Sequence, residues 1–205
     1  MYKDFTGIIL SGGKSSRMGS DKALLTVGDE TIIERITDLM KSIFSDVHIV
    51  TNTPEDYKFL NIPLYEDIFK NKGPLSGIHS GLHHSLTKEN FFISCDLPII
   101  SKELIKYIVE FKSDKSIRYC IASGRQHYLA GVYSKNLIPE IEKIIKVSPK
   151  QSEKKEHKFS VKNLLMKIEV EIINVEHLSF YNDDLFFNLN TPEDFEVLKN
   201  ISLNR

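Results

Sequence analysis

Short apolar runs alternate along the chain with longer segments in which apolar residues recur every three or four positions. The short runs are rich in β-branched and aromatic residues, which is typical of buried strands. They lie at 7–10, 47–50, 91–94, 118–122, 130–134 and 169–175. The longer segments have the spacing of one helix face, and they lie at 32–43, 104–111, 137–145 and 192–200. A further helical segment, 72–82, begins at a Gly-Pro turn.

Strands that alternate with helices predict a mainly parallel sheet covered on both faces, which is a Rossmann-like three-layer α/β sandwich. No internal repeat or linker interrupts the pattern, so the sequence predicts a single domain over residues 1–205. The polar, heavily charged stretch 148–160 predicts a flexible surface loop. Ligands of such folds bind beyond the carboxyl ends of the strands, so the residues that follow the strands are the candidates for chemistry.

Composition limits the choice of partners and compartment. The chain has 205 residues, 41% hydrophobic and 27% charged, which is ordinary for a soluble globular protein. Its net charge of −1 gives no reason to expect nucleic acid or an anionic membrane as a partner. The N-terminus lacks an apolar signal core, so a cytoplasmic protein is expected. Cys95 and Cys120 lie in apolar runs, and we expect isolated buried thiols there.

The segment "LSGGKSSRMGSDKALL" (10–25) follows the first strand and has the features of a phosphate site. Gly12 and Gly13 permit a close backbone approach and positive φ, so that successive N–H groups can converge on an anion. Arg17 and Lys22 add positive charge suited to phosphate oxygens. The glycine spacing matches neither the P-loop nor the dinucleotide fingerprint. A tight surface turn with solvated bases is the alternative.

Asp96, in "SCDLP", follows a predicted strand that Pro98 prevents from continuing. A carboxylate at this position can hold Mg²⁺, which bridges nucleotide phosphates with one or two carboxylates and several waters. The alternative is a cap for the next helix, but Ser101 already fits that N-cap role.

Glycines and histidines occur together in "KGPLSGIHSGLHH" (72–84). Glycines at 73, 77 and 81 suit the close approach of a base or ribose, and an ordinary turn with a crowded helix contact is the alternative. His79 and His83, four residues apart and next to His84, have the spacing of a zinc pair. No third ligand is evident, so a helix face or core packing explains them better.

Four blocks of the sequence carry a resemblance to a known family: "LSGGKSSRMGSDKALL" (10–25), "GPLSGI" (73–78), "CDLP" (95–98) and "NLNTPEDF" (188–195). On these blocks the chain resembles the molybdenum cofactor guanylyltransferases, a family of MobA-like nucleotidyltransferases. The resemblance implies that the predicted sandwich is of the nucleotide-diphospho-sugar transferase type. Ser11 stands where the family usually has Ala, and a position that acts mainly through its backbone tolerates this change.

The resemblance also implies roles for the matched positions. It implies that the nucleotide lies against Leu10, Ser11, Gly12, Gly13, Lys22, Asp67, Gly77 and Asp96. It implies that catalysis depends on Lys22, Arg17 and Asp96, with Mg²⁺ held by Asp96. It implies a pterin substrate near His127, Asn188 and Asn190, although Tyr128 stands where the family usually has Pro after this histidine.

The implied reaction is Mg²⁺-dependent transfer of GMP from GTP to molybdopterin or its molybdenum-loaded form. Pyrophosphate is released and molybdopterin guanine dinucleotide is formed. The attacking phosphate is already anionic, so catalysis would rest on alignment and charge neutralisation. The implied partners are the two substrates and, transiently, other proteins of molybdenum cofactor biosynthesis and the acceptor enzymes. A CTP-using cytidylyltransferase, a sugar-phosphate nucleotidyltransferase and a non-catalytic nucleotide-binding module stay open as alternatives.

Overall fold

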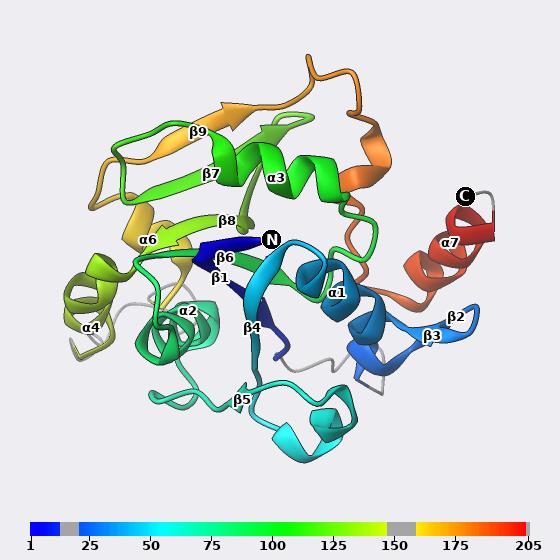
Figure 1. Ribbon diagram of the computed structural model, residues 1–205, viewed down its shortest axis with the longest axis horizontal. Helices are drawn as coiled ribbons and strands as arrows, with labels where there is room; N and C mark the ends of the chain where they lie inside the picture. The colour runs from blue at the N-terminus through cyan, green and yellow to red at the C-terminus, as the bar shows by residue number, and fades with distance from the viewer. Residues whose placement is uncertain (13–20, 147–158, 204–205) are drawn as a thin grey trace, which may run out of the picture.

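A seven-stranded sheet forms the centre of the computed structural model, which describes residues 1–12, 21–146 and 159–203 (Figure 1). The strand order is β5-β4-β1-β6-β8-β7-β9. The strands are β1 (Tyr2–Leu10), β4 (Phe44–Val50), β5 (Leu64–Tyr65), β6 (Glu89–Ser94), β7 (Ile117–Ala122), β8 (Arg125–Ser134) and β9 (Glu171–Asn174). Two short strands, β2 (Thr26–Val27) and β3 (Glu30–Thr31), form a separate antiparallel pair.

The sheet is mainly parallel, as the sequence predicts. Strand β1 lies between β4 and β6 and runs parallel to both, while β5 and β9 run parallel to β4 and β7. Strand β8 is antiparallel to both of its neighbours, β6 and β7. A two-residue turn at Ser123 and Gly124, with φ of 50° and 67°, joins β7 to β8. Positive φ at both central residues is what a tight hairpin turn matched to the strand twist requires.

Helices cover both faces of the sheet, so the three-layer sandwich is confirmed (Figure 1). The helices are α1 (Ile32–Lys41), α2 (Gly73–His84), α3 (Lys102–Glu110), α4 (Ile138–Lys146), α6 (Val161–Leu165) and α7 (Pro192–Leu203). Side chains of a strand point alternately to its two faces. In β1, Ile9 therefore packs in one cluster with α1 and α3, whereas Ile8 packs in the other with α2, α4 and α6.

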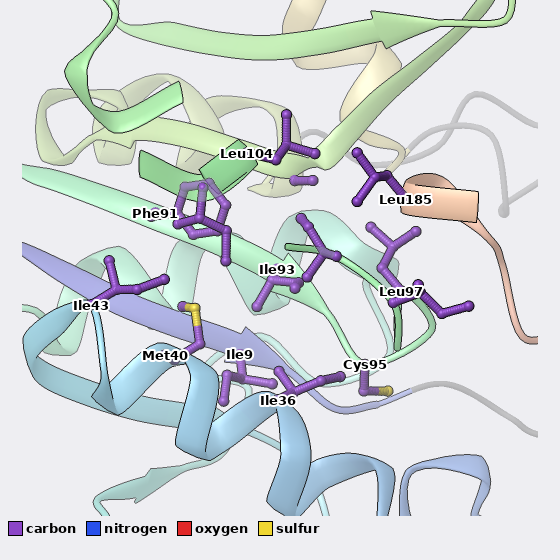
Figure 2. Packing of buried hydrophobic residues seen from close by; sticks show 14 of the residues in the cluster. Ile9, Ile36, Met40, Ile43, Phe91, Ile93, Cys95, Leu97, Leu104 and Leu185 are labelled. Carbon is purple, nitrogen blue, oxygen red and sulfur yellow. The ribbon is translucent and has the colours of Figure 1, made fainter. Parts of the chain in front are cut away.

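Figure 2 shows the first of these clusters, where Ile9 of β1 and Ile93 of β6 pack with Ile36 and Met40 of α1. On the same face, Leu104 of α3 joins the cluster. Burying an aliphatic side chain of this size contributes roughly 1.5–3 kcal/mol. The layer therefore holds α1 and α3 firmly against the strands and fixes where the strand ends lie.

Several local expectations are confirmed at the element ends. The Ser101 hydroxyl accepts a hydrogen bond from the Leu104 N–H at 3.2 Å and so is the N-cap of α3. Pro192 is the first residue of α7, where a missing N–H costs nothing. Cys95 and Cys120 are both buried and unbridged. No described helix is long and apolar enough to cross a membrane.

Most of the predicted surface loop 148–160 lies outside the described residues. At its end, Phe159 is 6% exposed and packs in the cluster of α2, α4 and α6. The Lys72 ammonium lies over this ring, 4.2 Å from its centroid. Phe159 is thus part of the core.

Candidate active site

The carboxyl ends of four neighbouring strands form one edge of the sheet, and the backbone beyond them is held by further hydrogen bonds. The Ser11 N–H donates to the Val50 carbonyl at 3.0 Å, and the Thr51 N–H donates to the Tyr65 carbonyl at 2.8 Å. On the other side of β1, the Cys95 N–H donates to the Leu10 carbonyl at 3.1 Å. The first residues after β1, β4 and β6 are therefore fixed by the same ladder as the strands, which suits a preorganised site.

Two charged residues from distant parts of the sequence meet at this edge. Lys22 begins the 3-10 helix η1 (Lys22–Leu24), and its ammonium lies 3.6 Å from the Asp96 carboxylate beyond β6. The same ammonium donates to the Leu189 carbonyl at 2.9 Å and to Asn190 Oδ1 at 3.4 Å. The side chains of Lys22 and Asp96 are 18% and 23% exposed. We call Lys22, Asp96 and Asn190 the lysine–aspartate cluster.

The C-terminal segment is attached to this cluster by its backbone. The Leu189 N–H donates to the Asp96 carbonyl at 2.9 Å. The N–H groups of Asn190 and Thr191 both donate to Asp194 Oδ2 at 2.8 Å, and these bonds hold the pKa of that carboxyl below its usual value. The start of α7 is thereby fixed beside Asp96, with the exposed Asn188 just before it.

The donor set at Asp96 fits a magnesium ion. Mg²⁺ binds through one or two carboxylates and takes its other ligands from water and substrate phosphates. Asp96 offers one partly exposed carboxylate at the strand end. Among the described residues no group of three or more His, Cys, Asp or Glu side chains is placed to hold a metal by itself. Asp96 is therefore the described residue that would hold the ion.

A second acid, Asp67, stands beyond β5 and pairs with an amide. Its Oδ2 accepts from Asn52 Nδ2 at 2.9 Å, and its N–H donates to Asn52 Oδ1 at 3.3 Å. Burial raises the pKa of Asp67, against the opposing effects of the Asn52 hydrogen bond and the Lys70 charge. We call these residues the Asn52–Asp67 pair. Asn52 was not predicted, although the polar "TNT" directly after the run 47–50 is a signal that marks it.

Gly77 in α2 lies next to two other predicted nucleotide-binding residues. A Cβ at this position would stand 3.2 Å from Leu10 Cδ2 and 3.8 Å from Asp67 Oδ1. Leu10, Asp67 and Gly77 are thus neighbours, as their predicted shared role requires. Gly81 differs, because its Cβ would lie 2.8 Å from the Phe92 ring and 2.9 Å from Ile8. At Gly81 the crowded helix contact is the explanation.

The start of the predicted phosphate loop differs in part from expectation. Gly12 does not have a positive φ, and a Cβ there would meet none of the described residues within 4 Å. Ser11 does not act only through its backbone, because its buried hydroxyl lies 2.8 Å from the Tyr57 hydroxyl. Gly13 and Arg17 lie outside the described residues.

His127, near the start of β8, lies at the same sheet edge as the parallel strand ends. Its ring stacks on Phe186 with centroids 3.8 Å apart. Phe186 ends the 3-10 helix η4 (Asp183–Phe186), shortly before Asn188. Burial lowers the pKa of His127. One segment, 183–190, therefore brings together the three predicted pterin contacts. It contains Asn188 and Asn190, and its Phe186 stacks on His127.

Two histidines of α2 pack against side chains of neighbouring segments. His79 is buried against Phe69, and its Nε2 lies 3.3 Å from Glu142 on α4. The His84 ring stacks on Tyr65 at 4.0 Å between centroids. These contacts attach α2 to its neighbours, in agreement with the helix-packing interpretation.

Comparison with known proteins identifies the family of the chain. The profile of the MobA-like NTP transferase domain matches residues 7–160. A protein of Carboxydothermus hydrogenoformans named "Probable molybdenum cofactor guanylyltransferase" is 34% identical over 201 residues, which is 97% of each chain. A protein of the same name from Pelotomaculum thermopropionicum is 36% identical over 195 residues, 92% of this chain and 89% of its own.

Solved structures show the same fold. A protein from Aquifex aeolicus of known crystal structure is 31% identical in sequence to this chain, and the two structures superimpose with a TM-score of 0.73. The match covers 91% of this chain and 93% of that one. Molybdopterin-guanine dinucleotide biosynthesis protein A from Archaeoglobus fulgidus superimposes with a TM-score of 0.80 at 19% identity, over 98% and 100% of the two chains. The likeness to the second, at this identity, concerns the fold alone. The domain match and the full-length relatives together show that this chain belongs to the MobA-like NTP transferase family of nucleotidyltransferases.

Proposed function

We propose that the protein transfers GMP from GTP to molybdopterin, in its free or molybdenum-loaded form, with Mg²⁺ as the metal. One observation carries the proposal: Lys22 and Asp96, distant in sequence, meet 3.6 Å apart at the strand-end edge. A cation beside a carboxylate that can hold a metal is what the neutralisation of a reacting triphosphate requires. The names of the full-length relatives support the choice of substrates.

In the proposed reaction an oxygen of the terminal phosphate of molybdopterin forms a bond to the α-phosphorus of GTP. The bond from that phosphorus to the α–β bridging oxygen breaks, and its electron pair leaves with pyrophosphate. The attacking oxygen is already anionic, so no side chain needs to remove a proton. The protein contributes alignment of the two substrates and neutralisation of charge.

Lys22 is the residue best placed for charge neutralisation. Its ammonium has three donors and contacts Leu189, Asn190 and Asp96. On nucleotide binding we expect it to exchange such contacts for oxygens of the α-phosphate, while Arg17 binds the β- and γ-phosphates. Mg²⁺, when bound to Asp96, would supply further positive charge to the phosphates.

The remaining residues divide between the two substrates. The nucleoside end of GTP would lie against Leu10, Ser11, Gly12, Gly13, Gly77 and the Asn52–Asp67 pair. The pterin would lie against His127, Asn188 and Asn190. The contact of Lys22 with Asn190 supports this division, because it links the nucleotide residues to the segment that carries the pterin residues.

The testing experiment is pyrophosphate release by the purified protein with Mg²⁺ and molybdopterin, in parallel reactions with GTP, CTP, ATP and UTP. Turnover with GTP alone supports the proposal. Turnover with CTP alone keeps the reaction type but rejects GTP as the substrate. Absence of turnover with all four nucleotides rejects the proposed acceptor.

A lysine variant then links the activity to the cluster. We expect Lys22→Ala to lower turnover with GTP by about 100-fold or more, since it removes a preorganised charge from the reacting phosphate. Lys143→Ala is the matched control, because this lysine is 72% exposed and, among the described residues, pairs only with Glu140 of its own helix. Equal activity of the two variants would contradict the role of Lys22.

A further inference from the structure

Three side chains from separate segments form a hydrogen-bonded chain beside the lysine–aspartate cluster. The hydroxyl of Tyr57, in the 3-10 helix η2 (Pro54–Leu60), lies 2.8 Å from Ser11 Oγ and 2.5 Å from Asp21 Oδ2. Tyr57 is fully buried and Ser11 is 2% exposed. A buried hydroxyl is costly to leave without a partner, so these contacts are strongly favoured in the folded protein.

The chemistry of the three groups fixes the direction of the hydrogen bonds. A carboxylate only accepts hydrogen bonds, so Tyr57 donates its single proton to Asp21. The Ser11 hydroxyl then donates to the Tyr57 oxygen. Ser11, Tyr57 and Asp21 thus form one directed chain of hydrogen bonds that ends on the Asp21 carboxylate.

Each end of this chain is adjacent to a charged residue of the cluster. The other oxygen of Asp21 accepts from the Ala23 N–H at 3.0 Å, so Asp21 is the N-cap of η1, and Lys22 is the first residue of that helix. At the opposite end, Ser11 follows Leu10, whose carbonyl accepts a hydrogen bond from the Cys95 N–H at 3.1 Å, and Cys95 directly precedes Asp96. The hydrogen-bonded chain therefore joins the backbone that carries Lys22 to the backbone that carries Asp96.

We propose that Tyr57, acting through Ser11 and Asp21, is a positioning residue that sets the location of Lys22 relative to Asp96. The tests of this inference that measure turnover rest on the proposed function. Misplacing a reacting group by about 1 Å can cost about 100-fold in rate. A hydroxyl that holds the start of η1 therefore influences the reaction without touching a substrate.

Ser11 contributes less to this arrangement than Tyr57 does. Its hydroxyl supplies a donor to Tyr57 that an alanine would lack. The Tyr57–Asp21 bond does not need Ser11, so the serine strengthens an arrangement that stands without it. We therefore expect a graded response, large at Tyr57 and small at Ser11.

The first experiment compares Tyr57→Phe with Tyr133→Phe. Both tyrosines are fully buried, and each substitution removes only a hydroxyl oxygen. The Tyr133 hydroxyl, however, donates to the Tyr128 carbonyl, and Tyr133 packs in the other core cluster, with α2 and α4. Tyr57→Phe should lower kcat/KM for GTP by about 10-fold to 100-fold. Tyr133→Phe should lower the melting temperature by about as much as Tyr57→Phe does. Its kcat/KM should stay within about two-fold of the wild-type value. Unchanged kcat/KM in Tyr57→Phe, with reduced stability only, would overturn the proposal.

The second experiment uses Ser11→Ala and the double variant. Ser11→Ala should lower kcat/KM about three-fold, and it keeps the proposal testable if Tyr57→Phe does not fold. The double variant Ser11→Ala/Tyr57→Phe should be no worse than Tyr57→Phe alone, because the serine acts through the tyrosine hydroxyl. Multiplied effects in the double variant would show that the two residues act separately and would overturn the positioning role.

Calorimetric binding of GTP with Mg²⁺ separates this inference from the proposed function. If the wild type binds GTP without turnover, the proposed reaction fails, and the affinity decides the role of Tyr57. An affinity about ten-fold weaker in Tyr57→Phe than in Tyr133→Phe then supports the positioning role. Equal affinity of the two variants overturns it. A wild type that neither binds GTP nor turns it over overturns both.

Discussion

The lysine–aspartate cluster and the Asn52–Asp67 pair occupy equivalent places in the fold but have different chemistry. Asp96 and Asp67 each stand two residues beyond a parallel strand, β6 and β5. Asp96 faces the Lys22 ammonium at 3.6 Å. Asp67 faces the Asn52 amide at 2.9 Å, and burial raises its pKa.

The difference shows that place and role have separate origins in this fold. The alternation of strands and helices brings an acid to the strand-end edge. The neighbour that each acid meets there comes from another part of the chain. A cationic neighbour suits a carboxylate that handles phosphate charge, whereas a neutral amide suits one that recognises a ligand by hydrogen bonds. The same isosteric substitution at both acids should therefore give different defects.

Asp96→Asn should give the larger defect. The change removes the negative charge that would hold Mg²⁺ and leaves the shape of the side chain. We expect kcat with GTP and molybdopterin to fall by about 100-fold or more. The melting temperature should change little, because asparagine keeps the size and shape of the aspartate side chain.

Steady-state kinetics at saturating GTP measures this effect, and Asp114→Asn is its control. Asp114 is 89% exposed and lies beside Lys115, so it reproduces an aspartate–lysine pair away from the strand ends. If Asp96→Asn kept the kcat of Asp114→Asn, the distinction between the two acids would collapse.

Asp67→Asn should change binding more than catalysis. The substitution replaces one acceptor oxygen by a donor and disturbs both hydrogen bonds with Asn52. A site that loses a matched hydrogen bond to its ligand binds it about ten-fold more weakly. We therefore expect the KM for GTP to rise by about that factor with kcat within a few-fold. A fall in kcat equal to that of Asp96→Asn would show that the acids share one role.

The sheet and its helices could be predicted from the sequence because their signals are local. The runs at 7–10 and 91–94 correspond to the inner parallel strands β1 and β6. The direction of β8 was not specified, since an apolar run carries no direction. Its hairpin had a local sign, Ser123-Gly124 between two strands, which is a known turn pair.

The candidate site could be predicted only as separate residues. Lys22, Asp96 and Asn190 were each predicted, but their contact depends on how the C-terminal segment lies across the sheet edge. Tyr57 gave no signal, because an aromatic residue in an irregular segment reads as core. Its link to Ser11 and Asp21 arises only when η2 is packed against the start of η1.

The smallest expected effect concerns the pH dependence of stability at Asp67. Its pKa in the folded protein is raised above the ordinary 3.8, mainly by burial. The folded state therefore holds this proton more tightly than the unfolded state. Stability from this group is fully present below pH 3.8 and is lost as the pH rises through the raised pKa. Asp67→Asn has no proton to lose at this position. Its free energy of unfolding should therefore rise relative to that of the wild type as the pH rises through this range.

Urea unfolding of the wild type, Asp67→Asn and Asp114→Asn at a series of pH values measures this gain. The difference between wild type and Asp67→Asn should shift in favour of the variant as the pH rises above 3.8, and then stay constant. Asp114→Asn is the exposed control, since its carboxylate is 89% exposed. Parallel curves for all three proteins would mean that Asp67 is as well solvated as Asp114. The contrast between the two strand-end acids would then rest on Lys22 alone.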